Sequence, residues 1–227
     1  MIISILDVDC GDKSLLKKAL THPSYTKENN LDSLENYERL EFFGDSVLKL
    51  FSSKMLINKY PDYDEGKLSK IRSILVSDAT ISKIANEIGL SKLIVLGDAE
   101  EKQSGRTRES NIACSFEAVL GAYYLDGKQS EIEEFLNYQL SKYIEDIDNN
   151  FAKYNAKAVL QEYTQSLNKE LPVYKTVSTS GPAHEPIFEV EVCYQGKVLA
   201  SASGSSKKEA QQNCAYKACL GLNIIKV

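Results

Sequence analysis

The sequence predicts two domains: an all-α domain over residues 1–148, a linker at 149–155 and a smaller α+β domain over 156–227. Apolar residues recur at helical spacings through the first two thirds of the chain, whereas two later segments alternate apolar and polar residues as strands do. Charge divides near the same place. Residues 155–227 hold eight Lys, no Arg and six acidic residues, a net charge of +2, and residues 1–154 carry −7. This division favours an acidic helical domain joined to a mildly basic α-β-β-β-α domain.

The first helix is expected over Ser14–Leu20, with Asp12 as its N-cap. The THPSY segment that follows contains Pro23, which interrupts the helix. His22 in this segment could act as a base or a ligand, although a histidine bonded to a nearby backbone group is the commoner arrangement. The polar residues 27–35 are expected to form a loop.

The next helix, Tyr37–Leu50, is the most informative segment of the chain and is expected to continue until Pro61. Gly44 in its interior costs about 1 kcal/mol relative to Ala, which suggests that something approaches the backbone closely there. The side chains expected to form its buried stripe are Leu40, Phe43, Val47 and Leu50.

Three acidic residues of this helix share one face, because Glu38, Glu41 and Asp45 fall at i, i+3 and i+7. Such carboxylates repel one another unless a cation lies among them or water solvates the face. A solvated acidic face is the commoner case for an arbitrary helix, so the rest of the chain must decide between the two.

The remainder of the first domain is also expected to be helical. Residues 66–90 indicate two consecutive helices, with Ser77 or Asp78 capping the second. The polar stretch 97–111 is expected to be a mobile loop whose basic residues could meet phosphates or simply be solvated. A last long helix is expected over Ser130–Ile147.

A second strong helix, Asn111–Leu125, carries a solitary Glu117 on a largely apolar sequence, with Ser110 as the expected N-cap. Glutamate is seldom buried without a partner, so this helix is the second element that could complete a metal site. Cys114 lies on the same face as Glu117.

The second domain is expected to contain two helices around a three-stranded hairpin sheet. Its elements are predicted at Ala156–Lys169, Val173–Ser180, Phe188–Tyr194, Lys197–Ala202 and Ser206–Leu220. Ser206 and Glu209 have the spacing of a capping box. Lys207 and Lys208 occupy the first turn of the last helix, where the helix dipole disfavours cations, so a bound anion is expected there.

Composition excludes several classes of protein. With 43% hydrophobic and 26% charged residues, the chain is typical of a globular protein, and it has no apolar run long enough for a transmembrane helix. The apolar Ile2–Leu6 is too short for a signal peptide. Five cysteines, odd in number and without a C-x-x-C pair, indicate free thiols and a cytoplasmic location.

Several blocks of the chain closely resemble the ribonuclease III family in the same order. They are ALTHPSY (19–25), ERLEFFGDSVL (38–48), GKLSKIRSILV (66–76) and ESNIACSFEAVLGAYYLDG (109–127). The C-terminal segments LQEYTQ, GPAHEPIFEVEV and SGSSKKEAQQNCAYKA look like a double-stranded RNA-binding domain. The resemblance covers essentially the whole chain and implies a helical nuclease domain N-terminal to the RNA-binding domain.

The resemblance implies a homodimeric endoribonuclease that cleaves double-stranded RNA, with Mg²⁺, or Mn²⁺ as a substitute, activating the attacking water. The products would carry 5′-phosphate and 3′-hydroxyl ends, and precursors of rRNA and mRNA are the expected targets. By matching position, Glu41, Asp45 and Glu117 are metal ligands. Glu38, Asp45 and Glu117 are the implied catalytic residues, and Phe42 falls at a dimer contact.

For the second domain, the resemblance implies contacts with successive grooves of an RNA duplex. Gln161 and Glu162 would face one minor groove, and His184 would face the next. Lys207 and Lys208 would then lie on phosphates across the intervening major groove.

Cys114 stands where the family has an aspartate metal ligand, and a thiol is a soft ligand that suits Mg²⁺ poorly. Either water replaces the missing carboxylate in a working site, or the chain is a catalytically impaired double-stranded RNA-binding or ribosome-assembly protein. A working enzyme is favoured, because the other acidic residues, Glu38, Glu41, Asp45 and Glu117, would otherwise repel one another without purpose.

Overall fold

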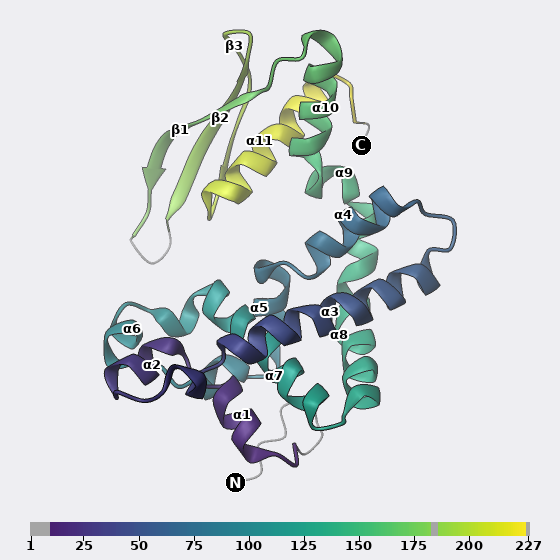
Figure 1. Ribbon diagram of the computed structural model, residues 1–227. Coiled ribbons are helices and arrows are strands. Elements are labelled where there is room, and N and C mark those ends of the chain that lie inside the picture. The colour runs from purple at the N-terminus through teal and green to yellow at the C-terminus, as the bar shows by residue number, and fades with distance from the viewer. Residues whose placement is uncertain (1–9, 183–185, 226–227) are drawn as a thin grey trace. The chain divides into compact units, whose positions relative to one another are not determined.

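The computed structural model describes residues 10–182 and 186–225 and divides into two compact units, Met1–Glu145 and Asp146–Val227 (Figure 1). The first unit is helical and the second contains a three-stranded sheet with helices, as the sequence predicts. None of the helices in the described part of the chain combines the length and hydropathy that crossing a bilayer requires.

The first unit consists of α-helices linked by short connections. Its helices are α1 (Lys13–Ala19), α2 (Pro23–Glu28), α3 (Glu38–Lys59), α4 (Glu65–Leu75), α5 (Asp78–Glu87), α6 (Asp98–Lys102), α7 (Glu109–Leu125) and α8 (Gln129–Asn149). Three short 3₁₀ turns, η1 (Ser33–Glu35), η2 (Leu90–Leu93) and η3 (Gly105–Thr107), lie between them. Helix α8 ends at Asn149, so the first residue of the expected linker is helical.

Helix ends follow the local chemistry of the sequence at several positions. Asp12 caps α1 as predicted, accepting hydrogen bonds from the backbone N–H groups of Ser14 and Leu15. Ser77 is the N-cap residue of α5, although its side chain makes no capping bond, and Gly89 ends that region in the left-handed conformation at φ +76°.

Pro23 does more than interrupt the first helix, because it begins α2 at the position where a missing N–H is tolerated. His22 is the N-cap, and its Nδ1 accepts the backbone N–H of Ser24 at 3.0 Å. The commoner reading of His22, a bond to nearby backbone, is confirmed. The segment 27–35, expected to be a loop, includes the last residues of α2 and the turn η1.

The stretch 97–111 is not the loop that its polarity predicted, because it contains α6, η3 and the start of α7. Arg106 holds it together, bonding Glu101 at 2.6 Å and donating to the carbonyl oxygens of Ser91 and Ile94 at 2.9 Å each. Ser110 is not the N-cap of α7, since that helix already begins at Glu109.

Helix α7 forms the centre of the first unit, with most of its side chains buried against α1, α3 and α5. The stripe expected on α3 is confirmed in part, because Leu40 and Val47 are buried and Phe43 is half-buried. The prediction for Leu50 is wrong, since this side chain is 55% exposed, whereas Leu48 and Phe51 are buried.

The second unit contains α9 (Phe151–Tyr154), α10 (Ala156–Asn168), β1 (Val173–Ser180), β2 (Ile187–Tyr194), β3 (Lys197–Gly204) and α11 (Lys207–Gly221). The antiparallel sheet has the order β1-β2-β3, and α11 packs on β2 and β3 (Figure 1). Alternate residues of β2 point into the core, where Val190 and Val192 are fully buried, as the alternation predicts.

Some apolar residues of the second unit lie outside its core. Leu167 is exposed, one residue before α10 ends. Cys214 and Cys219 are buried as small core residues, whereas Cys193 is only half-buried.

Candidate functional site

Helices α3 and α7 cross at two glycines that allow their backbones to touch. A Cβ atom added at Gly44 would lie 1.7 Å from the carbonyl oxygen of Glu117, and one added at Gly121 would lie 2.5 Å from the carbonyl oxygen of Leu40. The close approach inferred from Gly44 in the sequence is confirmed. Its consequence is that the acidic face of α3 lies beside Cys114 and Glu117 of α7.

The Glu117 carboxyl lies half-buried beside other negative charges. Its pKa is raised to about 8, first because burial penalises the charged form, and then because of the charges of Asp45, Glu41 and Asp78. Lys49 acts in the opposite direction. The structure therefore brings together three of the sequence-predicted site residues, Glu41, Asp45 and Glu117, in a field that favours a cation.

Cys114 lies in the same field and is a neutral hydrogen-bonding group there. Burial raises the pKa of its thiol, and a hydrogen bond with Glu41 and the negative charges of Glu41, Glu117 and Asp78 raise it further. A protonated thiol keeps one negative charge out of the site, whereas an aspartate at this position would add one.

Glu38 lies at the first turn of α3 and is held by the buried Asn36. The Asn36 side-chain oxygen accepts the backbone N–H of Glu38 at 3.0 Å, while its Nδ2 donates to Glu38 Oε2 at 3.3 Å. Asn36 thus satisfies a free N–H at the helix start and orients the Glu38 carboxylate. Tyr37 is buried nearby, and burial, followed by electrostatic interactions with Cys114, Glu41 and Glu38, raises the pKa of its hydroxyl.

The donor chemistry of Glu41, Asp45 and Glu117 suits a hard divalent cation, because carboxylate oxygens are the preferred ligands of Mg²⁺ and Mn²⁺. Within residues 10–182 and 186–225, no three acidic, Cys or His side chains already converge around one point. Asp45 instead bonds Lys49, with Nζ 2.7 Å from Oδ2.

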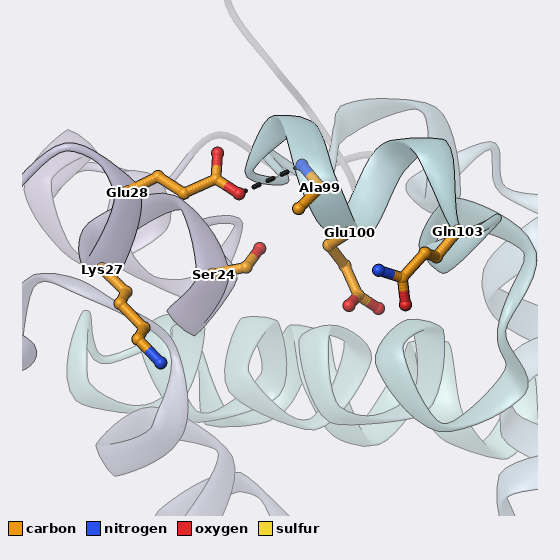
Figure 2. Close-up of a pocket in the computed structure, with 6 residues that line it drawn as sticks. All are labelled: Ser24, Lys27, Glu28, Ala99, Glu100 and Gln103. Atoms are coloured by element: carbon orange, nitrogen blue, oxygen red, sulfur yellow. Dashed lines mark hydrogen bonds between the residues drawn. The ribbon is translucent and has the colours of Figure 1, made fainter.

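A hollow of about 440 Å³ elsewhere in the first unit is lined by Ser24, Lys27, Glu28, Ala99, Glu100 and Gln103 (Figure 2). Its polar groups already serve the fold. Glu28 accepts the first backbone N–H groups of α6, from Asp98 at 2.6 Å and Ala99 at 3.0 Å, and Glu100 bonds Arg108 at 2.6 Å. Both carboxylates that line the hollow are therefore engaged in contacts that hold the fold.

The predicted RNA-binding residues lie on α10 and at the start of α11. Gln161 and Glu162 are exposed on α10, and Lys207 and Lys208 occupy the first turn of α11 as expected. His184 lies outside the described residues. The paired strands place the start of β2 beside the end of β3, since Phe188 pairs with Gly204, so the start of β2 and the α11 N-terminus share one end of the sheet.

The N-terminus of α11 is capped more elaborately than the capping box predicts. Ser206 Oγ accepts the Glu209 N–H at 3.1 Å, but the Glu209 carboxylate reaches one residue further back, to the backbone N–H of Ser205 at 2.8 Å. Lys207 Nζ lies 5.9 Å from the centre of the Phe188 ring. The turn is thereby ordered with its lysines on the surface.

Sequence reasoning missed three charged residues near these sites. Asp78 comes from α5, far from α3 in the sequence, and only the packing of α5 on α7 places its charge near Glu117. Lys49 could have been found, because it lies at i+4 from Asp45. Lys157 of α10 bonds Gln211 at 2.6 Å, and its pKa is lowered by burial and then by Lys208, so a third lysine lies near the expected anion site.

Phe42, the expected dimer contact, projects from α3 and is 80% exposed in the single chain.

Comparison with known proteins matches both parts of the chain. Residues 12–144 match the family described as Ribonuclease-III-like, and residues 156–222 match the double-stranded RNA binding motif.

Similar curated proteins extend over nearly the full length. A protein named Ribonuclease 3 from Wolbachia pipientis subsp. Culex pipiens (strain wPip) is 38% identical over 214 residues, covering 94% of this chain and 92% of the relative. Another of the same name from Staphylococcus haemolyticus (strain JCSC1435) is 39% identical over 204 residues, covering 90% and 83%.

Among solved structures, the nuclease domain of ribonuclease III from Campylobacter jejuni has a TM-score of 0.55 and 36% identity. The match covers 60% of this chain and 92% of that one, and the description of that structure refers to flexibility in a region involved in dimer formation.

Proposed function

Because this chain belongs to the ribonuclease III family, whose members are endonucleases, we propose that it hydrolyses double-stranded RNA with the help of a divalent metal ion. The products would carry 5′-phosphate and 3′-hydroxyl ends. The observation that carries the proposal is the crossing of α3 and α7 at Gly44, which sets Glu41 and Asp45 beside Glu117.

Glu41, Asp45 and Glu117 would hold the ion, with Mg²⁺ as the first choice and Mn²⁺ as a substitute. When bound, the ion would supply an activated water and stabilise the negative charge that develops on the phosphate. The chain itself contributes the arrangement of the carboxylates. Asn36 orients Glu38 at the edge of the group, where it can support contact with the ion or the RNA.

Double-stranded RNA would be held by the second unit, which matches the double-stranded RNA binding motif. Gln161 and Glu162 would meet one minor groove, the loop containing His184 the next, and Lys207 and Lys208 the phosphates between them. Two copies of the chain would associate through Phe42, and this is consistent with the dimer-forming region described for the Campylobacter jejuni nuclease domain. We place this activity in the cytoplasm, on precursors of rRNA and mRNA.

The test is cleavage of a long, end-labelled RNA duplex in Mg²⁺ and, separately, in Mn²⁺. The wild-type protein is expected to cut in at least one metal and not in EDTA, and Asp45→Asn is expected to lose at least about 100-fold in rate. Glu109→Gln, which removes an exposed acid at the start of the same α7 helix, is the matched control and should cut normally. Absence of cleavage in both metals would refute the proposal.

One observation favours a second candidate, a binding protein that has lost its chemistry. Cys114 is a neutral group where the family has a carboxylate ligand. The variant Cys114→Asp separates the two candidates in the same assay. A working enzyme cuts with Cys114 in place, whereas a protein that only binds RNA gains cleavage when the aspartate is restored.

A further inference from the structure

Lys49 is the cation nearest to a carboxylate of the proposed metal site. Its Nζ lies 2.7 Å from Asp45 Oδ2, one helical turn away on α3. The positive charge of Lys49 also opposes the rise in the pKa of Glu117, so Lys49 interacts electrostatically with a residue of α7 as well. Lys49 therefore interacts with carboxylates on both helices that form the site.

The pair is one that an arriving ion could break. The side chains of Lys49 and Asp45 are 51% and 37% exposed, and an exposed ion pair of this kind contributes little to stability. A lysine ammonium on a flexible four-carbon stem can move into solvent without rearranging the backbone. A divalent cation carries twice its charge and binds several oxygens at once.

The local charge balance makes this competition matter. Cys114 offers a thiol where an aspartate would offer a carboxylate, so the proposed oxygen ligands are only Glu41, Asp45 and Glu117, and Lys49 is the cation bonded to one of them. Asp78 adds a more distant negative charge from α5. Each positive charge near so few ligands weakens the attraction for a metal ion.

We propose that Lys49 is the built-in counter-ion of this site, occupying Asp45 in the metal-free protein and lowering the affinity of the site for divalent cations. This inference rests on the proposed function. The inference goes beyond the proposed function because Lys49, which is not a metal ligand, would determine how tightly the ion binds.

The experiment is a titration of the whole protein with Mn²⁺ alone, without RNA, followed by electron paramagnetic resonance of the free ion and by calorimetry. Lys49→Gln should bind Mn²⁺ about tenfold more tightly than the wild type, because the competing charge is gone. Lys49→Arg keeps a cation at Asp45 and should remain within about twofold of the wild type.

Lys54→Gln is the matched control. Lys54 lies on the same helix, is 55% exposed and bonds an acidic residue, Glu133, at 2.6 Å, but away from the site. Its removal should leave Mn²⁺ affinity unchanged. Thermal unfolding in EDTA establishes that every variant compared is folded.

The outcomes separate this inference from the proposed function. If Asp45→Asn abolishes Mn²⁺ binding while Lys49→Gln binds as the wild type does, the metal site stands and the role of Lys49 is wrong. If Asp45→Asn binds as well as the wild type, or if the wild type binds no Mn²⁺, the site itself is wrong and both proposals fail.

Discussion

The carbonyl oxygen of Glu117 occupies the space that a side chain at Gly44 would need, since a Cβ there would lie only 1.7 Å away. Backbone contact of this kind cannot be relieved by turning a side chain. The distance between α3 and α7, and with it the spacing of the carboxylates on the two helices, therefore depends on the absence of one carbon atom.

Gly44→Ala should lower the free energy of unfolding by about 3 kcal/mol, because the helices must separate to admit the methyl group. This destabilisation should outweigh the roughly 1 kcal/mol by which Ala stabilises a helix interior relative to Gly. Urea unfolding followed by circular dichroism measures it. Cleavage should fall as well, since the separation moves Glu117 away from Glu41 and Asp45.

Gly66→Ala is the control for that experiment. Gly66 also lies in a helix of the first unit, α4, but a Cβ there would make only an ordinary contact of 3.4 Å with Asp64. It should be neutral or slightly stabilising. Equal stability of the two alanine variants would contradict the close contact.

Asn36→Ala should reduce both stability and cleavage. It removes the acceptor for the Glu38 N–H, worth about 1 kcal/mol at a helix start, and the donor that orients the Glu38 carboxylate. Asn36→Ser can restore the acceptor but is too short to hold that carboxylate. It should recover stability in urea without recovering the cleavage rate, and recovery of both would show that Asn36 serves only the fold.

Asp126 should make the first unit sensitive to acid. Its carboxylate accepts the backbone N–H groups of Gly11 at 2.7 Å and Asp12 at 3.0 Å, and these bonds, Gly11 first, hold its pKa below the ordinary value of 3.8. Because the folded-state pKa is the lower one, the stabilisation is complete above the unfolded-state pKa and is lost as the pH falls through the folded-state pKa.

The variant Asp126→Asn should therefore flatten the decline of stability below about pH 4, measured by thermal unfolding as a function of pH. At neutral pH the variant should be less stable than the wild type, because the charged acceptor is gone. An acid profile that is identical in both proteins would exclude this contribution.

The lysines at the start of α11 should determine the salt dependence of RNA binding. Lys207→Ala combined with Lys208→Ala is expected to reduce the slope of log K against log salt by up to about 2. Each lysine–phosphate contact that is lost means that about one counterion fewer is released from the RNA on binding. Filter binding or fluorescence anisotropy with a duplex in EDTA measures it. Lys197→Ala, at the β2–β3 turn at the other end of the sheet, should leave the slope unchanged.

Much of the fold could be predicted, because its signals are local. Asp12 caps the helix that follows it, alternation along β2 sets which side of the strand is buried, and helical spacing marks α3 and α7. Failures occurred where a residue's role depends on what lies across from it. Leu50 fits the periodicity of α3 but is exposed, and Arg106 converts a polar stretch into ordered turns through carbonyl groups of another segment.

The sequence by itself determined the order of helices and strands, the presence of the acidic residues, the glycine at the helix contact and the departure at Cys114. These features depend on residue type and spacing along one chain. Only the tertiary structure decided that Asp78 adds its charge to Glu117 and how buried each carboxyl is. Those properties arise from the distance between separate helices, because charge and burial act through space and not along the sequence.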